Sequence, residues 1–137
     1  MKIIALDIGD QWTGIALSDA LGLLAKPYKT VTTDQLILQL KELFIKERIT
    51  QGVIGYPKTL RGTISEQTKK IEEHYEALKA QFPHIAWILW DERLSSKRAE
   101  LHKKSTSKEE KQRSHAVAAA FILDSYLGYL HMHKNLG

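Results

Sequence analysis

The pattern of apolar and polar positions changes character once along the chain. Three short segments come first, each either rich in β-branched residues or alternating in polarity, at residues 2–8, 13–19 and 23–32. Gly9 ends the first segment and predicts a tight hairpin into the second. Pro27 indicates that the third strand lies at a sheet edge or carries a bulge, because proline cannot donate to a central ladder. The first part of the chain is therefore predicted to be an antiparallel meander.

Helical spacing begins after this meander and then alternates with short apolar runs. The predicted helices cover residues 35–47, 64–81 and 114–131, with a short helix near 95–103, and the predicted strands cover 52–56 and 85–90. Continuous apolar character in 85–90 predicts a central strand. Residues 104–113 are so highly charged that we predict a loop there.

The resulting order, βββαβαβα, predicts an α/β fold with a mixed five-stranded sheet and helices on both faces. A chain of 137 residues fits a single domain over 1–137. No stretch reaches the roughly 18 apolar residues of a membrane span, and the first apolar run is too short for a signal peptide. We therefore expect a cytoplasmic protein that makes no membrane contact.

Composition limits the chemistry that the chain can perform. There is no cysteine, which excludes disulfides, thiolate metal sites and cysteine nucleophiles. The formal net charge of +4 is compatible with a polyanionic partner and equally with an ordinary soluble protein. Basic residues gather in one region, as a candidate nucleic-acid surface or a solvated face: Lys97, Arg98, Lys103, Lys104, Lys108, Lys111 and Arg113.

Acidic side chains follow two of the predicted strands. Asp7 ends the first strand, and Asp91 and Glu92 end the strand at 85–90. If the two strands are parallel and adjacent, their carboxyl ends lie together, where ligands of open α/β sheets bind. Clustered carboxylates repel each other, and a hard cation such as Mg²⁺ or Mn²⁺ relieves that repulsion. His115 opens the last helix and is a candidate for the same edge.

Each of these residues also has a purely structural interpretation. Asp7 is in the position of a turn residue, and Asp91 is in the position of a helix cap or of an ion-pair partner for Arg93. A histidine at a helix start is often a packed core residue. Lys58 and Arg61 lie in a loop between a strand and a helix, where backbone amides and two cations can hold phosphate or simply shape a turn.

Four segments resemble the YqgF family, which is related to RuvC-type Holliday-junction resolvases within the ribonuclease H-like superfamily. They are LDIGDQWTGIALSD at 6–19, VIGYPKTLRG at 53–62, DERLS at 91–95 and SHAVAAAFILDSYL at 114–127. They occur in the family's order over nearly the whole chain. The resemblance implies a ribonuclease H-like fold and a metal-dependent nuclease activity.

The resemblance also implies roles for individual residues. Asp7 matches the first-strand metal ligand, and Glu92 with Asp91 matches the acidic pair at the strand end, with Arg93 matching the arginine after it. His115 stands where the family usually has an aspartate. Gln11 and Trp12 stand where the family's hairpin usually has a lysine and an arginine, so the resemblance implies weaker phosphate contact at this hairpin.

The expected function is hydrolysis of phosphodiesters in structured RNA, at the 5′ end of the pre-16S ribosomal RNA. Mg²⁺ or Mn²⁺ held by Asp7, Glu92 and His115 would be the cofactor. RNA is the expected partner and branched DNA the alternative, bound by a monomer or homodimer. A junction-resolving DNA endonuclease would act as a two-fold dimer. A non-catalytic nucleic-acid-binding module, favoured by the replaced residues, is the rival from another class.

Overall fold

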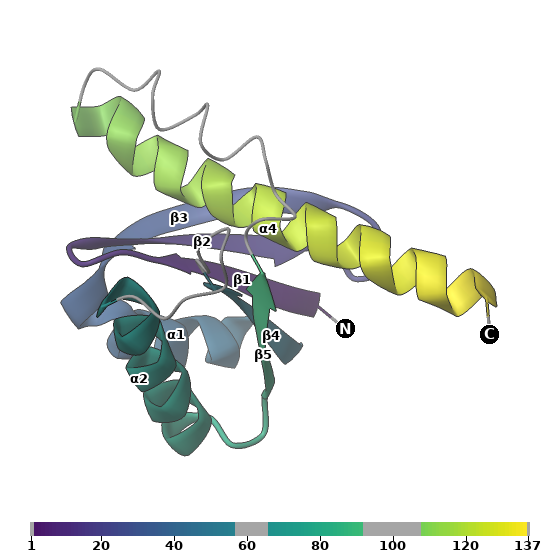
Figure 1. Ribbon diagram of the computed structural model, residues 1–137, viewed down its shortest axis with the longest axis horizontal. Coiled ribbons are helices and arrows are strands. Elements are labelled where there is room, and N and C mark those ends of the chain that lie inside the picture. Colours follow the sequence, from purple (N-terminus) through teal and green to yellow (C-terminus); the bar gives the residue numbers. More distant parts are fainter. Residues whose placement is uncertain (1, 57–65, 92–107, 137) are drawn as a thin grey trace.

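A five-stranded mixed sheet lies between two layers of helix (Figure 1). The computed structural model describes residues 2–56, 66–91 and 108–136. The strands are β1 (Lys2–Ile8), β2 (Trp12–Ser18), β3 (Ala25–Thr32), β4 (Ile49–Tyr56) and β5 (Ala86–Asp91), in the spatial order β3-β2-β1-β4-β5. The helices are α1 (Leu36–Lys46), α2 (Glu66–Gln81) and α4 (Lys108–Leu136), with a 3₁₀ turn at Thr33–Gln35. The predicted α/β fold is confirmed.

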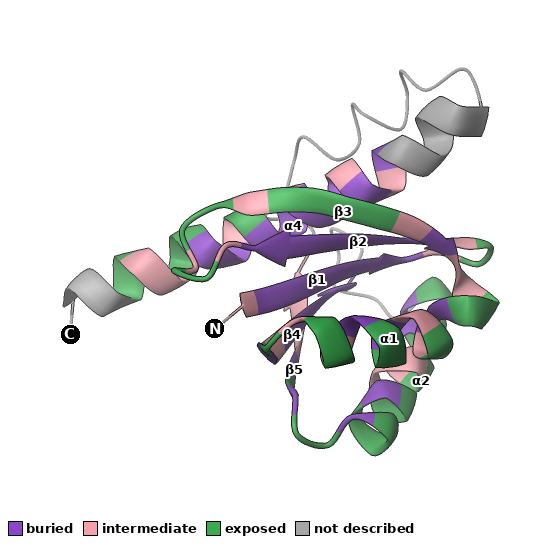
Figure 2. Cartoon of the chain, turned by 180° about the vertical axis from the view of Figure 1, so that it is seen from behind, coloured by how far each residue is buried: buried purple, intermediate pink, exposed green. Residues whose placement is uncertain are grey.

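The first three strands form the predicted antiparallel meander. β3 is an outer strand of the described sheet, and its register with β2 shifts where Ile15 and Ala16 face Lys29 and Pro27. The interpretation of Pro27 is therefore correct on both counts, edge and bulge. β3 is exposed over most of its length, whereas β1 and β2 are buried (Figure 2).

Strands β1, β4 and β5 are parallel, with β4 in the middle. The prediction that 85–90 forms a central strand is wrong, because β5 is the outer strand of the described sheet. Its apolar character has another cause, namely that helices cover both of its faces. Trp87 packs in the core with α2, over Gly52, while Trp90 packs on the side of α4.

Alternation along β1 assigns its side chains to the two layers. Ile4, Leu6 and Ile8 enter the core formed with α1 and α2. Ile3 and Ala5 enter the second core, in which α4 contributes its fully buried residues Ala119, Ile122 and Leu123. In Figure 1, α4 crosses one face of the sheet and α1 with α2 covers the other. Asp7 follows Ile3 and Ala5 and therefore faces α4.

The last helix begins earlier than expected. The charged segment predicted as a loop up to residue 113 is helical from Lys108, and α4 continues to Leu136. Charge indicated exposure, but Lys, Glu, Gln and Arg are also strong helix formers, so a charged run is compatible with a solvated helix. Within the described ranges, no helix is long and apolar enough to cross a membrane.

Candidate active site at the carboxyl end of β1

Asp7 is a buried carboxylate at the end of a central strand. Its exposed fraction is only 1%. The strand places it in the row after Ala5, on the face that α4 covers, with Gly14 of β2 as its register partner. A charged group is costly to bury unless another group or a cation compensates it. The burial of Asp7 therefore requires a compensating group at this position.

His115 supplies the neighbouring side chain from α4. Its Nδ1 lies 3.6 Å from Oδ2 of Asp7, with 22% of the histidine side chain exposed. That separation is an electrostatic contact longer than a hydrogen bond. The structure thus brings together Asp7 and His115, which are 108 positions apart in the sequence.

Gly14 explains why α4 can approach so closely. A Cβ atom built on Gly14 would lie 1.9 Å from the carbonyl oxygen of His115 and 2.7 Å from the amide nitrogen of Ala116. The backbone of α4 therefore rests directly on the backbone of β2. Small residues at the start of the buried face of α4, with Ala118 and Ala119 fully buried, permit the same approach.

Hydrogen bonds fix the turn that follows Asp7. The Gly9 amide donates to the Trp12 carbonyl at 2.9 Å, closing the hairpin. The Thr33 hydroxyl donates to the Gly9 carbonyl at 2.7 Å, and the Thr33 amide donates to the carbonyl of Gln11 at 2.9 Å. The turn is thus held to the start of the segment that leads into α1, which gives Asp7 a rigid base.

Asp91 does not join Asp7. In β5, Trp87 and Leu89 enter the core of α1 and α2, so alternation places Asp91 on that face, opposite to Asp7. Its register partner is Tyr56, whose hydroxyl donates to Glu72 of α2. The hydrogen bond to Glu72 raises the pKa of Tyr56. At this end of the sheet, Asp7 and His115 therefore lie on the face covered by α4. Asp91, Tyr56 and Glu72 lie on the opposite face, which α2 covers.

The other predicted site residues lie partly or wholly outside the described part of the chain. Outside it are Glu92, Arg93, Lys58, Arg61, Lys97, Arg98, Lys103 and Lys104. Lys108, Lys111 and Arg113 belong to the first turns of α4. Within residues 2–56, 66–91 and 108–136, no three His, Asp or Glu side chains form a group that could hold a metal ion.

A second polar cluster was missed by the sequence interpretation. Asp10 forms an ion pair with Lys70 of α2 at 3.2 Å. Together with His74 they line a small cavity of about 50 Å³ between the β1–β2 turn and α2. Burial lowers the pKa of His74. The only sequence signal was the position of Asp10 directly after Gly9, and nothing in the sequence pairs it with α2.

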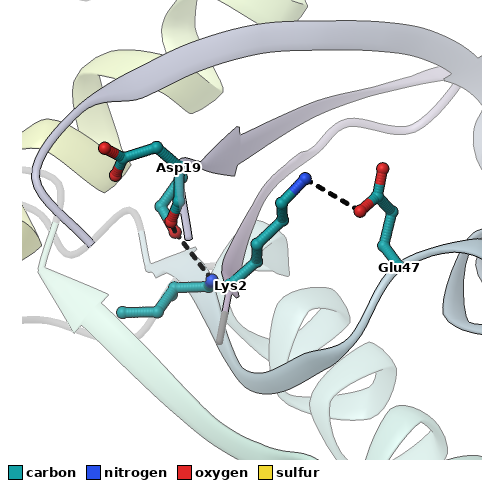
Figure 3. Close-up of polar contacts among 5 residues, drawn as sticks. Lys2, Asp19 and Glu47 are labelled. Carbon is teal, nitrogen blue, oxygen red and sulfur yellow. Dashed lines mark hydrogen bonds and ion pairs between the residues drawn. The ribbon is translucent and has the colours of Figure 1, made fainter. Parts of the chain in front are cut away.

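Other polar contacts connect the strands at the opposite end of the sheet (Figure 3). Lys2 pairs with Glu47 at 2.8 Å, and the Ile3 amide donates to the Ser18 hydroxyl, which donates in turn to the carbonyl of Asp19. A larger cavity lies at this end, lined by Lys2, Asp19 and Glu47 among others, and it contains none of the predicted site residues. Asp7 and His115 are thus at the opposite end of β1.

Asp7 and His115 offer one carboxylate and one imidazole as donors to a cation. Mn²⁺ accepts nitrogen as well as oxygen, and Mg²⁺ prefers oxygen. The two side chains fit part of a divalent-metal site, and both come from rigid elements. They also match the first and last of the motifs that carried the resemblance to a nuclease family.

The RuvX family, described as Holliday junction resolvase, matches residues 1–129 of the chain. The chain belongs to the RuvX family. The resemblance to YqgF, which denotes the same family, is therefore confirmed. This family membership places the chain among nucleases.

Curated members of the RuvX family have nearly the same length. A candidate pre-16S rRNA nuclease of Rubrobacter xylanophilus is 34% identical over 127 residues, covering 92% of this chain and 91% of the relative. Its counterpart in Desulfitobacterium hafniense is 36% identical over 134 residues, covering 95% and 94%. A solved structure of T. thermophilus RuvC in complex with a Holliday junction substrate superposes with a TM-score of 0.66 at 15% identity, covering 96% of both chains. That likeness shows the ribonuclease H-like fold.

Proposed function

We propose that this chain is a divalent-metal-dependent nuclease that hydrolyses phosphodiesters in structured RNA, at the 5′ end of the pre-16S ribosomal RNA. One observation carries the proposal: the buried carboxylate of Asp7 meets His115 at the carboxyl end of β1, in a member of a resolvase family. The curated relatives that are named for pre-16S rRNA favour RNA as the substrate.

Asp7, His115 and Glu92 would hold the cation, and a bound cation would supply Lewis-acid activation of water and charge neutralisation at the phosphate. Asp7 supplies negative charge from a position fixed by strand and turn hydrogen bonds. His115 supplies an imidazole nitrogen from α4. Because Asp91 faces α2, we give it no place among the ligands.

The substrate test compares two nucleic acids under the same conditions. Wild-type protein is incubated with a precursor RNA that spans the 5′ end of 16S rRNA and with a four-way DNA junction, each with Mg²⁺ or Mn²⁺. Cleavage of the RNA supports the proposal. Symmetric cleavage of the junction alone would favour the second candidate, a junction endonuclease, which the family description supports. Binding without cleavage of either would favour a non-catalytic module.

Metal preference gives the first prediction. His115 replaces the usual aspartate, so the site carries one negative charge fewer, which weakens Mg²⁺ more than Mn²⁺. We expect faster RNA cleavage with Mn²⁺ than with Mg²⁺, and we expect His115→Asp to shift the ratio of the two rates several-fold toward Mg²⁺. The ratio is measured over a titration of each metal. An unchanged ratio in His115→Asp would mean that His115 contacts no cation.

Salt dependence gives the second prediction. The cations proposed to contact phosphate are Lys58, Arg61, Arg93, Lys103, Lys104, Lys108, Lys111 and Arg113. Each lost phosphate contact reduces the slope of log affinity against log salt by about 0.7–0.9. Replacing Lys108, Lys111 and Arg113 together by Gln should therefore flatten the slope measured for the precursor RNA by up to about 2.1–2.7.

A control variant changes the same net charge elsewhere. Lys26, Lys41 and Lys46 are exposed on β3 and α1 and do not belong to α4, and they are replaced by Gln together. If both triple variants reduce the slope equally, overall charge governs binding and the start of α4 is only a solvated surface.

A further inference from the structure

Trp90, Tyr129 and His133 form a continuous aromatic surface beside α4, hereafter the aromatic track. The rings of Trp90 and Tyr129 are 5.2 Å apart between centroids, and those of Tyr129 and His133 are 4.0 Å apart. Tyr126 supports the track from below, with its ring edge-on to Trp90 at 5.2 Å. Each ring in the track thus has an aromatic neighbour at stacking distance.

The track is rigid and yet open to solvent. The indole of Trp90 donates to the Ser125 hydroxyl at 3.2 Å, and Nδ1 of His133 donates to the Tyr129 carbonyl at 2.9 Å. Tyr126 is buried, with its pKa raised by that burial. Tyr129, by contrast, is 44% exposed, and His133 is exposed as well. A core cluster would bury its outer rings, so this surface is available to a flat ligand.

The sheet places Trp90, the part of the track that lies on β5, in the same row as Asp7, whereas Tyr129 lies 14 residues along α4 from His115. The parallel register pairs Leu6 with Ile54 and Gly55 with Trp90, so Asp7, Gly55 and Trp90 lie in one row. Asp7 and Trp90 both face α4. Two strand spacings of about 4.8 Å put them roughly 10 Å apart across the sheet. That separation equals about three nucleotides at the ~3.4 Å rise of a stacked strand.

We propose that the aromatic track stacks unpaired bases of an RNA strand that passes over the Asp7 edge of the sheet. Every base has a flat π-face, so stacking on Tyr129 and His133 accepts any sequence, provided that the bases are unpaired. Bases inside a duplex or a junction arm stack on each other, so only a terminal pair offers a face to the track. The chain therefore recognises a single-stranded segment that runs from the row of Asp7 and Trp90 along the far part of α4. The path of the RNA over the Asp7 edge rests on the proposed nuclease function. The existence of the stacking surface does not depend on that function.

Binding to unpaired and paired forms of one RNA tests the proposal. A single-stranded RNA of about 12 nucleotides without self-complementarity is compared with the same strand annealed to its complement, using the full chain in EDTA so that no cleavage occurs. Tyr129→Leu should weaken single-strand binding about tenfold and duplex binding less than about twofold. The slope of log affinity against log salt should stay unchanged, because no phosphate contact is removed.

Two control variants accompany the test. Tyr129→Phe keeps the ring and should bind the single strand as wild type does. Tyr28→Leu removes an equally exposed tyrosine, 47% exposed on β3, and should leave both affinities unchanged. Equal losses on single strand and duplex, or no loss in Tyr129→Leu, would overturn the proposal.

The measurement also separates this inference from the nuclease proposal. Selective loss of single-strand binding supports the track even if the precursor RNA is never cleaved. If Tyr129→Leu instead dissociates a dimer in sedimentation analysis while single-strand binding is unaffected, the rings contact a second copy of the chain and the inference is wrong.

Discussion

Asp7→Asn should abolish RNA cleavage with both Mg²⁺ and Mn²⁺ while the protein stays folded. The amide keeps the shape of the carboxylate but loses its charge, and it is a poor ligand for a hard cation. Asp7 is almost fully buried at the end of β1, so no solvent-exposed carboxylate can move into its place from the turn. The loss should reach at least about a thousandfold, as expected when a charge that is central to metal catalysis is removed.

Stability measurements distinguish lost coordination from misfolding. Without metal, Asp7→Asn should unfold at a denaturant concentration close to that of wild type, because the amide fills the same buried volume as the carboxylate. With saturating Mn²⁺, wild type should gain about 2.7 kcal/mol at a hundredfold excess over the dissociation constant, and the variant should gain little. Both values come from denaturant titrations with and without Mn²⁺.

Asp10→Asn is the matched control. Asp10 lies three residues beyond Asp7 but is exposed and paired with Lys70 on the other side of the turn. An exposed ion pair contributes little to stability, so we expect near wild-type cleavage and stability. Wild-type activity in Asp7→Asn would exclude this edge of the sheet as the catalytic site. Equal losses in both variants would point to disruption of the turn.

Much of the fold follows from periodicity. The apolar, β-branched run in 2–8, the alternation in 13–19, the break at Gly9 and the placement of Pro27 sufficed to predict the meander and its bulge. These signals are local, because each depends only on the residue itself and on its neighbours in the sequence. The predicted helix over 35–47 likewise agrees with α1 within one residue, apart from the preceding 3₁₀ turn.

The positions of elements relative to each other were harder to infer. A strand covered by helices on both sides needs two apolar faces, whether it is central or outer. The sequence of β5 therefore could not show that β5 is an outer strand. The face on which Asp91 lies depends on the register of β5 with β4, which the sequence does not state. The aromatic track combines β5 with the far end of α4, and no local pattern joins Trp90 to Tyr129.

The candidate site was predictable where its residues end apolar runs. Asp7 lies at the end of a strand and His115 opens the buried part of a helix, so both could be named in advance, and the structure places them 3.6 Å apart. What the sequence left unnoticed is the contact that sets this distance. Gly14 stands within an alternating strand and carries no chemistry of its own, yet α4 rests on it.

Gly14→Ala should therefore be strongly destabilising and should also impair cleavage. The added Cβ would lie 1.9 Å from the His115 carbonyl oxygen, and because its neighbours are backbone atoms, no side-chain rotation relieves the clash. To relieve the clash, α4 must move away from β2. The free energy of unfolding should fall by about 3 kcal/mol, which is the upper end of the cost that overpacking usually has. Displacing His115 from Asp7 by about 1 Å should reduce the cleavage rate roughly a hundredfold. Urea titration and single-turnover cleavage measure the two effects.

Gly128→Ala, within α4 itself, is the control that separates the clash from the general effect of replacing glycine. No atom lies within 4 Å of a Cβ built at Gly128, and the position is exposed in the middle of the helix. Alanine there should stabilise the protein by about 0.5–1 kcal/mol, because glycine loses more conformational freedom on folding. The same substitution should thus act in opposite directions at positions 14 and 128. If Gly14→Ala were neutral in stability and in cleavage, the close contact between α4 and β2 would not be what holds His115 beside Asp7.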